Sequence, residues 1–134
     1  MPAVMALVLI VDDEKDSRDV VARYFRKAGY VTRCAPNGRQ ALAAIGTEMP
    51  DVVILDWMMP EMDGISFLQV LRSYLRWNSL PVVLLTAHQG EHIEAAMKLG
   101  VKRVFLKASF TLAELLECVN RLRDDPTSDC ASAG

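Results

Sequence analysis

The stretch Val8-Leu9-Ile10-Val11-Asp12-Asp13 joins a short apolar run to two carboxylates. Residues 52–56 (VVILD) and 82–86 (VVLLT) repeat this arrangement, and residues 104–107 (VFLK) end an apolar run with a lysine. If each run is a parallel β-strand, its last residues face the crevice at the carboxyl edge of the sheet, where open α/β sheets bind ligands. The sequence therefore predicts one site for a divalent metal and a phosphoryl group, made of Asp12, Asp13, Asp56, Thr86 and Lys107.

The composition indicates one compact domain. The 134 residues include 51% hydrophobic and 24% charged residues, which suits an α/β protein of this length. The net charge of −2, with no basic run, gives no electrostatic reason to bind nucleic acid or an acidic membrane. After Asp124 the residues become small and polar without periodicity. We therefore expect a domain over residues 1–124 and a flexible tail or linker stub over residues 125–134.

Two features predict a cytoplasmic location. The apolar residues 4–11 are too few to span a bilayer and lack the basic residues that open a signal peptide, so we expect a core strand there. The three cysteines, Cys34, Cys118 and Cys130, are odd in number, widely spaced and without a C-x-x-C motif. They predict reduced thiols rather than a disulfide framework or a zinc site.

Strand-like and helix-like patterns alternate five times, which is typical of βα units around a parallel sheet. The expected strands cover residues 6–11, 31–35, 51–55, 81–85 and 101–106. The first, third and fourth are continuously apolar, as buried central strands are, whereas the second and fifth are mixed, as edge strands are. With right-handed crossovers this pattern predicts the strand order 2-1-3-4-5. That order is a doubly wound, flavodoxin-like α/β fold with five helices.

The helices are predicted from apolar residues at helical spacing. Gly29 and Gly100 are expected to end the first and fourth helices, and Thr111 with Glu114 is expected to form a capping box at the start of the fifth. The third helix is expected to carry Phe67, Leu68, Leu71, Tyr74 and Leu75 in register.

The acidic residues suit Mg²⁺, which prefers oxygen ligands and keeps several of its waters. We expect Asp13 and Asp56 to bind the metal directly and Asp12 to bind it through water. Three carboxylates would then balance the charges of Mg²⁺ and Lys107. A carboxylate is ionised at neutral pH, so Asp56 needs no general base to attack phosphorus. Phosphorylation would add negative charge, and Thr86 and Lys107 are placed to donate hydrogen bonds to the added oxygens.

The chain resembles the receiver domains of two-component response regulators over roughly residues 6–123. Four features carry the resemblance, which are Val11-Asp12-Asp13-Glu14, Asp56-Trp57-Met58-Met59-Pro60-Glu61-Met62-Asp63-Gly64, Leu85-Thr86-Ala87, and Gly100 followed by Lys107. The resemblance implies that Asp56 accepts a phosphoryl group from a histidine kinase or a histidine phosphotransfer protein. Such a domain catalyses only its own phosphorylation and dephosphorylation, and it switches the binding of a downstream protein.

The same resemblance assigns roles around the acceptor. It implies that Asp12 and Asp13 hold Mg²⁺ together with Asp56, and that the backbone carbonyl of Met58 is a further ligand. Thr86 and Lys107 would bind the phosphoryl oxygens and relay the signal.

Two residues depart from the family pattern. The family usually has an aromatic residue three positions before the lysine, where this chain has Val104. Phe105 is not a substitute, because neighbouring strand residues point to opposite faces. Ala108 stands where the family usually has a proline in a cis bond to the lysine. A non-proline cis bond costs roughly 2.5–4 kcal/mol, so we expect a trans bond or a rearranged loop after Lys107.

Simpler interpretations exist for single residues. Asp12 and Asp13 could merely cap the first helix. His88 and His92 have the i, i+4 spacing of a zinc pair, but without a third ligand nearby we expect two surface histidines. Trp57 is expected to be partly exposed beside the site.

Two other classes of function remain open alternatives. A phosphatase of the haloacid-dehalogenase type would use an aspartate at the end of the first strand, but it requires Asp-x-Asp, which Val11-Asp12-Asp13-Glu14 does not supply. The other class is a receiver-like interaction module without phosphorylation. The complete acid set argues against it, whereas Val104 and Ala108 leave the readout of phosphorylation open.

Overall fold

Five strands and five helices alternate along the chain. The structure, a computed structural model, describes residues 6–57, 63–87 and 89–127. The elements are β1 (Leu7–Val11), α1 (Lys15–Lys27), β2 (Val31–Ala35), α2 (Gly38–Thr47), β3 (Val52–Asp56), α3 (Gly64–Ser73), β4 (Val82–Thr86), α4 (Glu91–Lys98), β5 (Arg103–Leu106) and α5 (Leu112–Asp124). Neighbouring strands pair in parallel in the order β2-β1-β3-β4-β5. The predicted fold class and strand order are confirmed.

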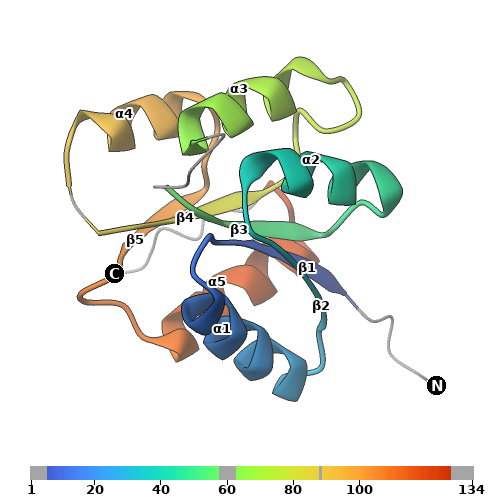
Figure 1. The fold of residues 1–134 in the computed structure, drawn as a ribbon, viewed down its shortest axis with the longest axis vertical. Coiled ribbons are helices and arrows are strands. Elements are labelled where there is room, and N and C mark those ends of the chain that lie inside the picture. The colour runs from blue at the N-terminus through green and yellow to red at the C-terminus, as the bar shows by residue number, and fades with distance from the viewer. Residues whose placement is uncertain (1–5, 58–62, 88, 128–134) are drawn as a thin grey trace.

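The sheet lies between two layers of helices. Figure 1 shows α1 and α5 on one face of the sheet and α2, α3 and α4 on the other. All residues of β1, β3 and β4 are buried, whereas β2 and β5 keep exposed or half-buried positions. The continuous apolar runs therefore mark the central strands correctly, because a strand covered on both faces buries nearly all of its side chains, with the polar Asp56 and Thr86 only at the last positions of β3 and β4.

The two faces of β5 separate Val104 from Phe105. Phe105 belongs to the apolar core beneath α1 and α5, and its ring lies 5.8 Å from that of Phe110. Val104 packs against the core on the opposite face, which includes Phe67 and Ala96. The alternation predicted for these neighbours is present, so the Phe105 ring lies away from the layer that contains α4.

The predicted helix ends are present. Gly29 and Gly100 follow α1 and α4 with φ angles of 99° and 82°, a region that glycine adopts without a steric penalty. At the start of α5 the Thr111 hydroxyl accepts a hydrogen bond from the Glu114 amide at 3.1 Å. The Glu114 carboxylate in turn accepts from the Thr111 amide at 2.9 Å, which completes the capping box.

The end of the third helix differs from the prediction. α3 ends at Ser73, and Tyr74 follows in an extended conformation. The expectation that the helix carries Tyr74 and Leu75 in register is therefore wrong, and the two side chains are 52% and 89% exposed. Arg72 accounts for the turn, because its guanidinium donates to the carbonyls of Leu80 and Leu99 at 2.8 and 2.7 Å. These bonds hold the chain beyond the helix close to the start of β4.

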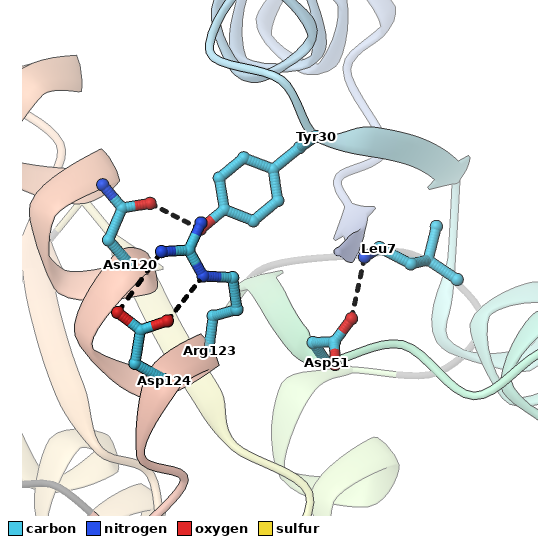
Figure 2. Close-up of polar contacts among 6 residues, drawn as sticks. All are labelled: Leu7, Tyr30, Asp51, Asn120, Arg123 and Asp124. Carbon is cyan, nitrogen blue, oxygen red and sulfur yellow. Dashed lines mark hydrogen bonds and ion pairs between the residues drawn. The ribbon is translucent and has the colours of Figure 1, made fainter. Parts of the chain in front are cut away.

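Polar contacts fix the ends of the strands that lie away from the acidic cluster (Figure 2). The Tyr30 hydroxyl donates to the Asn120 side-chain oxygen at 2.6 Å, which joins the start of β2 to α5. The Arg123 guanidinium lies 5.6 Å from the centre of the Tyr30 ring. The Asp51 carboxylate accepts from the Leu7 amide at 2.8 Å and so ties the start of β3 to β1.

One cysteine differs from expectation. Cys118 on α5 is disulfide-bonded, whereas Cys34 is a free and exposed thiol. The expectation of reduced thiols is therefore wrong for Cys118. Spacing along the chain did not reveal the bridge, because a disulfide depends on the distance between two residues in the folded protein.

Within the described residues, no helix combines the length and the apolar character needed to cross a lipid bilayer.

Candidate functional site

Three carboxylates meet at the carboxyl edge of the sheet. Asp12 directly follows β1, and Asp56 ends β3, the neighbouring strand. Asp12 and Asp56 are buried and Asp13 is exposed, and each offers a carboxylate oxygen within 4.8 Å of the others. The structure thus brings together three of the residues predicted from the ends of the apolar runs.

Hydrogen bonds to its backbone and to its carboxylate hold Asp12 in place. Its amide donates to the Ala35 carbonyl at 3.0 Å, and the Arg18 guanidinium donates to its carbonyl at 2.8 Å. Its carboxylate accepts from the Glu14 amide at 2.9 Å. Glu14, not Asp12 or Asp13, occupies the N-cap position of α1, and no side chain caps that helix. The interpretation of the two aspartates as caps of the first helix therefore does not hold.

Lys107 and Thr86 lie beside one another at the ends of β5 and β4. The Lys107 ammonium is 2.6 Å from the Asp56 carboxylate. The Lys107 amide donates to the Thr86 carbonyl at 2.8 Å, which fixes the two residues relative to each other. Thr86 is buried. No peptide bond between described residues is cis, so the trans bond expected between Lys107 and Ala108 is confirmed.

Burial and the neighbouring charges shift two pKa values. Burial raises the pKa of the Asp56 carboxyl to about 6, although the hydrogen bond and charge of Lys107 lower it. For Lys107, partial burial acts to lower the pKa, but the hydrogen bond and charge of Asp56 raise it overall. Asp56 is therefore a carboxylate whose charge is costly unless cations compensate it.

The acidic cluster fits a divalent cation. Its three carboxylates can carry a charge of −3 within 4.8 Å, and Lys107 supplies one positive charge at 2.6 Å. An all-oxygen set with one exposed member, Asp13, suits a hard cation that keeps some of its water. Met58, which the resemblance to receiver domains implies as a carbonyl ligand, lies outside the described residues.

Sequence reasoning did not find the position of His92. We expected a surface histidine, but His92 is half-buried in the first turn of α4. Its Nε2 atom lies 3.0 Å from the Thr86 hydroxyl. Its ring lies 5.2 Å from that of Trp57. The only signal in the sequence is that His92 falls in the first turn of the helix that follows Thr86. His88, the other member of the suggested zinc pair, lies outside the described residues.

Trp57 is more buried than expected. Its side chain is 9% exposed, so the prediction of partial exposure is wrong. The Gly64 amide donates to the Trp57 carbonyl at 3.1 Å, and a Cβ atom at Gly64 would lie 2.7 Å from the indole ring. The Asp63 side chain caps α3 by accepting from the Ser66 amide at 2.9 Å. The indole is therefore covered by the start of α3, where only a hydrogen atom fits.

The carboxylate cluster lies between β1 and β3, at the point where the strand order of this doubly wound sheet reverses and where such sheets bind their ligands. The family model for the response regulator receiver domain matches residues 8–120. The chain belongs to this family, and the resemblance inferred from its motifs is confirmed.

Relatives with known names support the assignment. The regulatory protein AtoC of Escherichia coli (strain K12) is 41% identical over 115 residues, which cover 85% of this chain and 24% of AtoC. The response regulator MprA of Mycolicibacterium vanbaalenii is 34% identical over 122 residues, which cover 91% of this chain and 52% of MprA. The chain thus spans about a quarter of one relative and half of the other.

Solved structures agree with the fold. The chemotaxis protein CheY4 of Vibrio cholerae superposes with a TM-score of 0.81 at 31% identity, covering 88% of this chain and 98% of CheY4. A putative response regulator from Chloroflexus aurantiacus J-10-fl gives a TM-score of 0.83 at 29% identity, covering 90% of this chain and 99% of its own.

Proposed function

We propose that this receiver domain accepts a phosphoryl group on Asp56 in an Mg²⁺-dependent reaction and thereby switches the binding of a downstream protein. The observation that carries the proposal is the environment of Asp56. Its carboxylate lies in one cluster with those of Asp12 and Asp13 and is 2.6 Å from the Lys107 ammonium. Acceptor, metal ligands and a cation for the phosphoryl oxygens are thus gathered in one place.

In the proposed transfer, an oxygen of the Asp56 carboxylate bonds to phosphorus while the bond between phosphorus and the donor's histidine nitrogen breaks. The departing imidazole takes up a proton from solvent. A pKa of about 6 leaves Asp56 ionised at neutral pH, so no base has to remove a proton first. Mg²⁺, when bound, neutralises and aligns the phosphoryl oxygens. Asp12, Asp13 and Asp56, with the Met58 carbonyl, are the ligands we propose for it.

Thr86 and Lys107 act on the product. Phosphorylation adds about −1.5 to −2 charges and three acceptor oxygens where Asp56 had one negative charge. The Lys107 ammonium lies 2.6 Å from the Asp56 carboxylate, so it is close enough to contact the phosphoryl oxygens once Asp56 is phosphorylated. We propose that the Thr86 hydroxyl donates to the same oxygens, since Thr86 ends β4, the strand beside β3, and its carbonyl accepts from the Lys107 amide at 2.8 Å. We propose that the domain also hydrolyses its own acyl phosphate and acts on no other substrate.

Receiver domains interact with histidine kinases and with downstream effectors. For this chain we propose a histidine kinase or a histidine phosphotransfer protein as the donor and one downstream protein as the effector. We propose no direct contact with nucleic acid or membrane. We place the receiver domain at residues 1–124, because α5 ends at Asp124, with residues 125–134 as a tail or linker. We also propose a cytoplasmic location, where ATP-dependent kinases can supply the donor.

Intact mass spectrometry tests the proposal. The chain is incubated with acetyl phosphate, with Mg²⁺ or with EDTA, and compared with Asp56→Asn and the matched control Asp125→Asn at an exposed position. We expect one phosphoryl adduct on the native chain and on Asp125→Asn, with Mg²⁺ only, and none on Asp56→Asn. An adduct that persists in Asp56→Asn, or that forms equally in EDTA, contradicts the proposal, and so does the absence of any adduct at saturating donor.

A further inference from the structure

We propose that His92 couples the Thr86 hydroxyl to the first turn of α4 and releases that turn when Asp56 is phosphorylated. This inference rests on the proposed function, since it describes how the phosphorylated site would be read. Two contacts carry it, one from His92 to Thr86 and one from His92 to Trp57.

The His92 side chain is held from two sides. Its Nε2 atom lies 3.0 Å from the Thr86 hydroxyl oxygen, and its ring packs on the Trp57 ring at 5.2 Å between centroids with a tilt of 35°. Trp57 is itself fixed, because it is 9% exposed and covered by Gly64. The indole packs against the imidazole and so keeps the His92 ring oriented toward Thr86.

β5 does not offer an equivalent contact. Val104, on the face of β5 that packs toward the α4 layer, has no polar side-chain atom and so cannot form a hydrogen bond with Thr86. Phe105 lies on the other face of the sheet. The polar ring beside Thr86 therefore comes from α4, and a change at Thr86 acts on α4 directly.

The Thr86 hydroxyl has a single proton to donate, and in its bond to His92 either partner can be the donor, according to the tautomer of the imidazole. Phosphoryl oxygens only accept hydrogen bonds, so phosphorylation of Asp56 draws that proton toward them. The Thr86 backbone is fixed by the Lys107 amide at 2.8 Å, which leaves the side-chain torsion as the part that turns. A change of rotamer carries the oxygen too far to keep a 3.0 Å contact with His92. The bond to His92 is therefore exchanged for one to the phosphoryl group.

α4 is well suited to respond to such an exchange. It has eight residues, of which Ala96 is buried. Its N-cap residue, Gly90, makes no side-chain hydrogen bond to the helix. His92 thus supplies a side-chain anchor to a first turn whose N-cap residue, a glycine, has no side chain to cap it. Loss of that anchor raises the rate at which the turn opens.

Hydrogen–deuterium exchange of the peptide that covers α4 tests the inference on the full chain, with intact mass measured on the same samples. His92→Phe keeps an aromatic ring against Trp57 but removes the bond to Thr86. His92→Gln keeps a side-chain amide that can bond to Thr86. Glu94→Gln, an exposed change on the same helix, is the matched control.

In the native chain and in Glu94→Gln we expect phosphorylation to speed exchange in the first turn of α4 about fivefold, the factor that one hydrogen bond of ordinary net strength represents. His92→Phe should exchange at the fast rate before phosphorylation and show no further increase, while still gaining the phosphoryl adduct. His92→Gln should retain most of the increase. Thr86→Val should match His92→Phe at rest, and the double variant should be no faster than either, as expected for two residues that share one bond.

The outcomes separate the two proposals. A phosphoryl adduct on the native chain without faster exchange in α4 overturns the role of His92 and leaves the proposed function standing. A full phosphorylation-dependent increase in His92→Phe does the same. If no adduct forms, the proposed function fails, and the role of His92 fails with it.

Discussion

Replacing Asp56 with asparagine should stabilise the metal-free protein. Asp56 is a buried carboxyl whose pKa is raised from 3.8 to about 6 in the folded chain. Ionising it therefore costs the folded state more than the unfolded state, by about 3 kcal/mol for a difference of this size. The asparagine side chain in Asp56→Asn is neutral and nearly the same shape, so it avoids this cost. Lys107, which is 37% exposed, can return to water when its partner is removed.

The sign of the pH dependence follows from the raised pKa. Without metal, the free energy of unfolding of the native chain should fall as the pH rises from about 4 to about 6 and should then level off, because the folded carboxyl resists ionisation over that interval. Asp56→Asn should lack this component. The difference between the two proteins should be near zero at pH 4 and reach about 2–3 kcal/mol in favour of Asp56→Asn at pH 8.

Urea unfolding in EDTA at a series of pH values measures this difference, and taking the difference removes the contribution of the other carboxyls. Mg²⁺ should then raise the midpoint of the native chain through mass action and leave that of Asp56→Asn nearly unchanged. Asp56→Asn that is less stable than the native chain at pH 8, or a difference that does not vary with pH, would refute the reasoning about the buried charge.

Three further variants test the packing and hydrogen bonds around this site and sheet. Gly64→Ala should destabilise the chain by about 1–3 kcal/mol in urea, because the new Cβ meets the Trp57 ring at 2.7 Å; an unchanged midpoint would show that the indole can move. Arg72→Ala should cost about 2–4 kcal/mol, since it leaves the carbonyls of Leu80 and Leu99 without their charged donor, and thermal unfolding within about 1 °C of the native chain would contradict this role. Tyr30→Phe removes the 2.6 Å bond to Asn120 and should cost about 1 kcal/mol, which calorimetry can measure, with a gain in stability as the opposing result.

The fold and the positions of the acidic residues were predictable because they depend on local patterns. A strand buried on both faces is continuously apolar, as residues 52–55 are. Polar residues then begin at the end of the strand, as Asp56 does. The order of the strands then follows from the handedness of the crossovers. Asp12, Asp13 and Asp56 meet because β1 and β3 are neighbours, so no knowledge of side-chain packing was needed to bring them together.

The features that the sequence did not reveal depend on contacts between distant segments. Leu75 continues the helical spacing, but Arg72 draws the chain out of α3 before that position, so Leu75 is exposed. Trp57 is buried because Gly64 lets the start of α3 close over it. His92 contacts Thr86 because the start of α4 lies beside the end of β4 in the folded chain, which no spacing rule encodes.

Locating the phosphoryl group tests the central claim most directly. After incubation with acetyl phosphate and Mg²⁺, borohydride reduces an aspartyl phosphate to homoserine, and peptide mapping then identifies the modified residue. We predict that Asp56 is the residue converted to homoserine, in an amount that falls to background when Mg²⁺ is replaced by EDTA. Conversion of Asp12 or Asp13 instead, or modification that is independent of Mg²⁺, would contradict the assignment of Asp56 as the acceptor in this site.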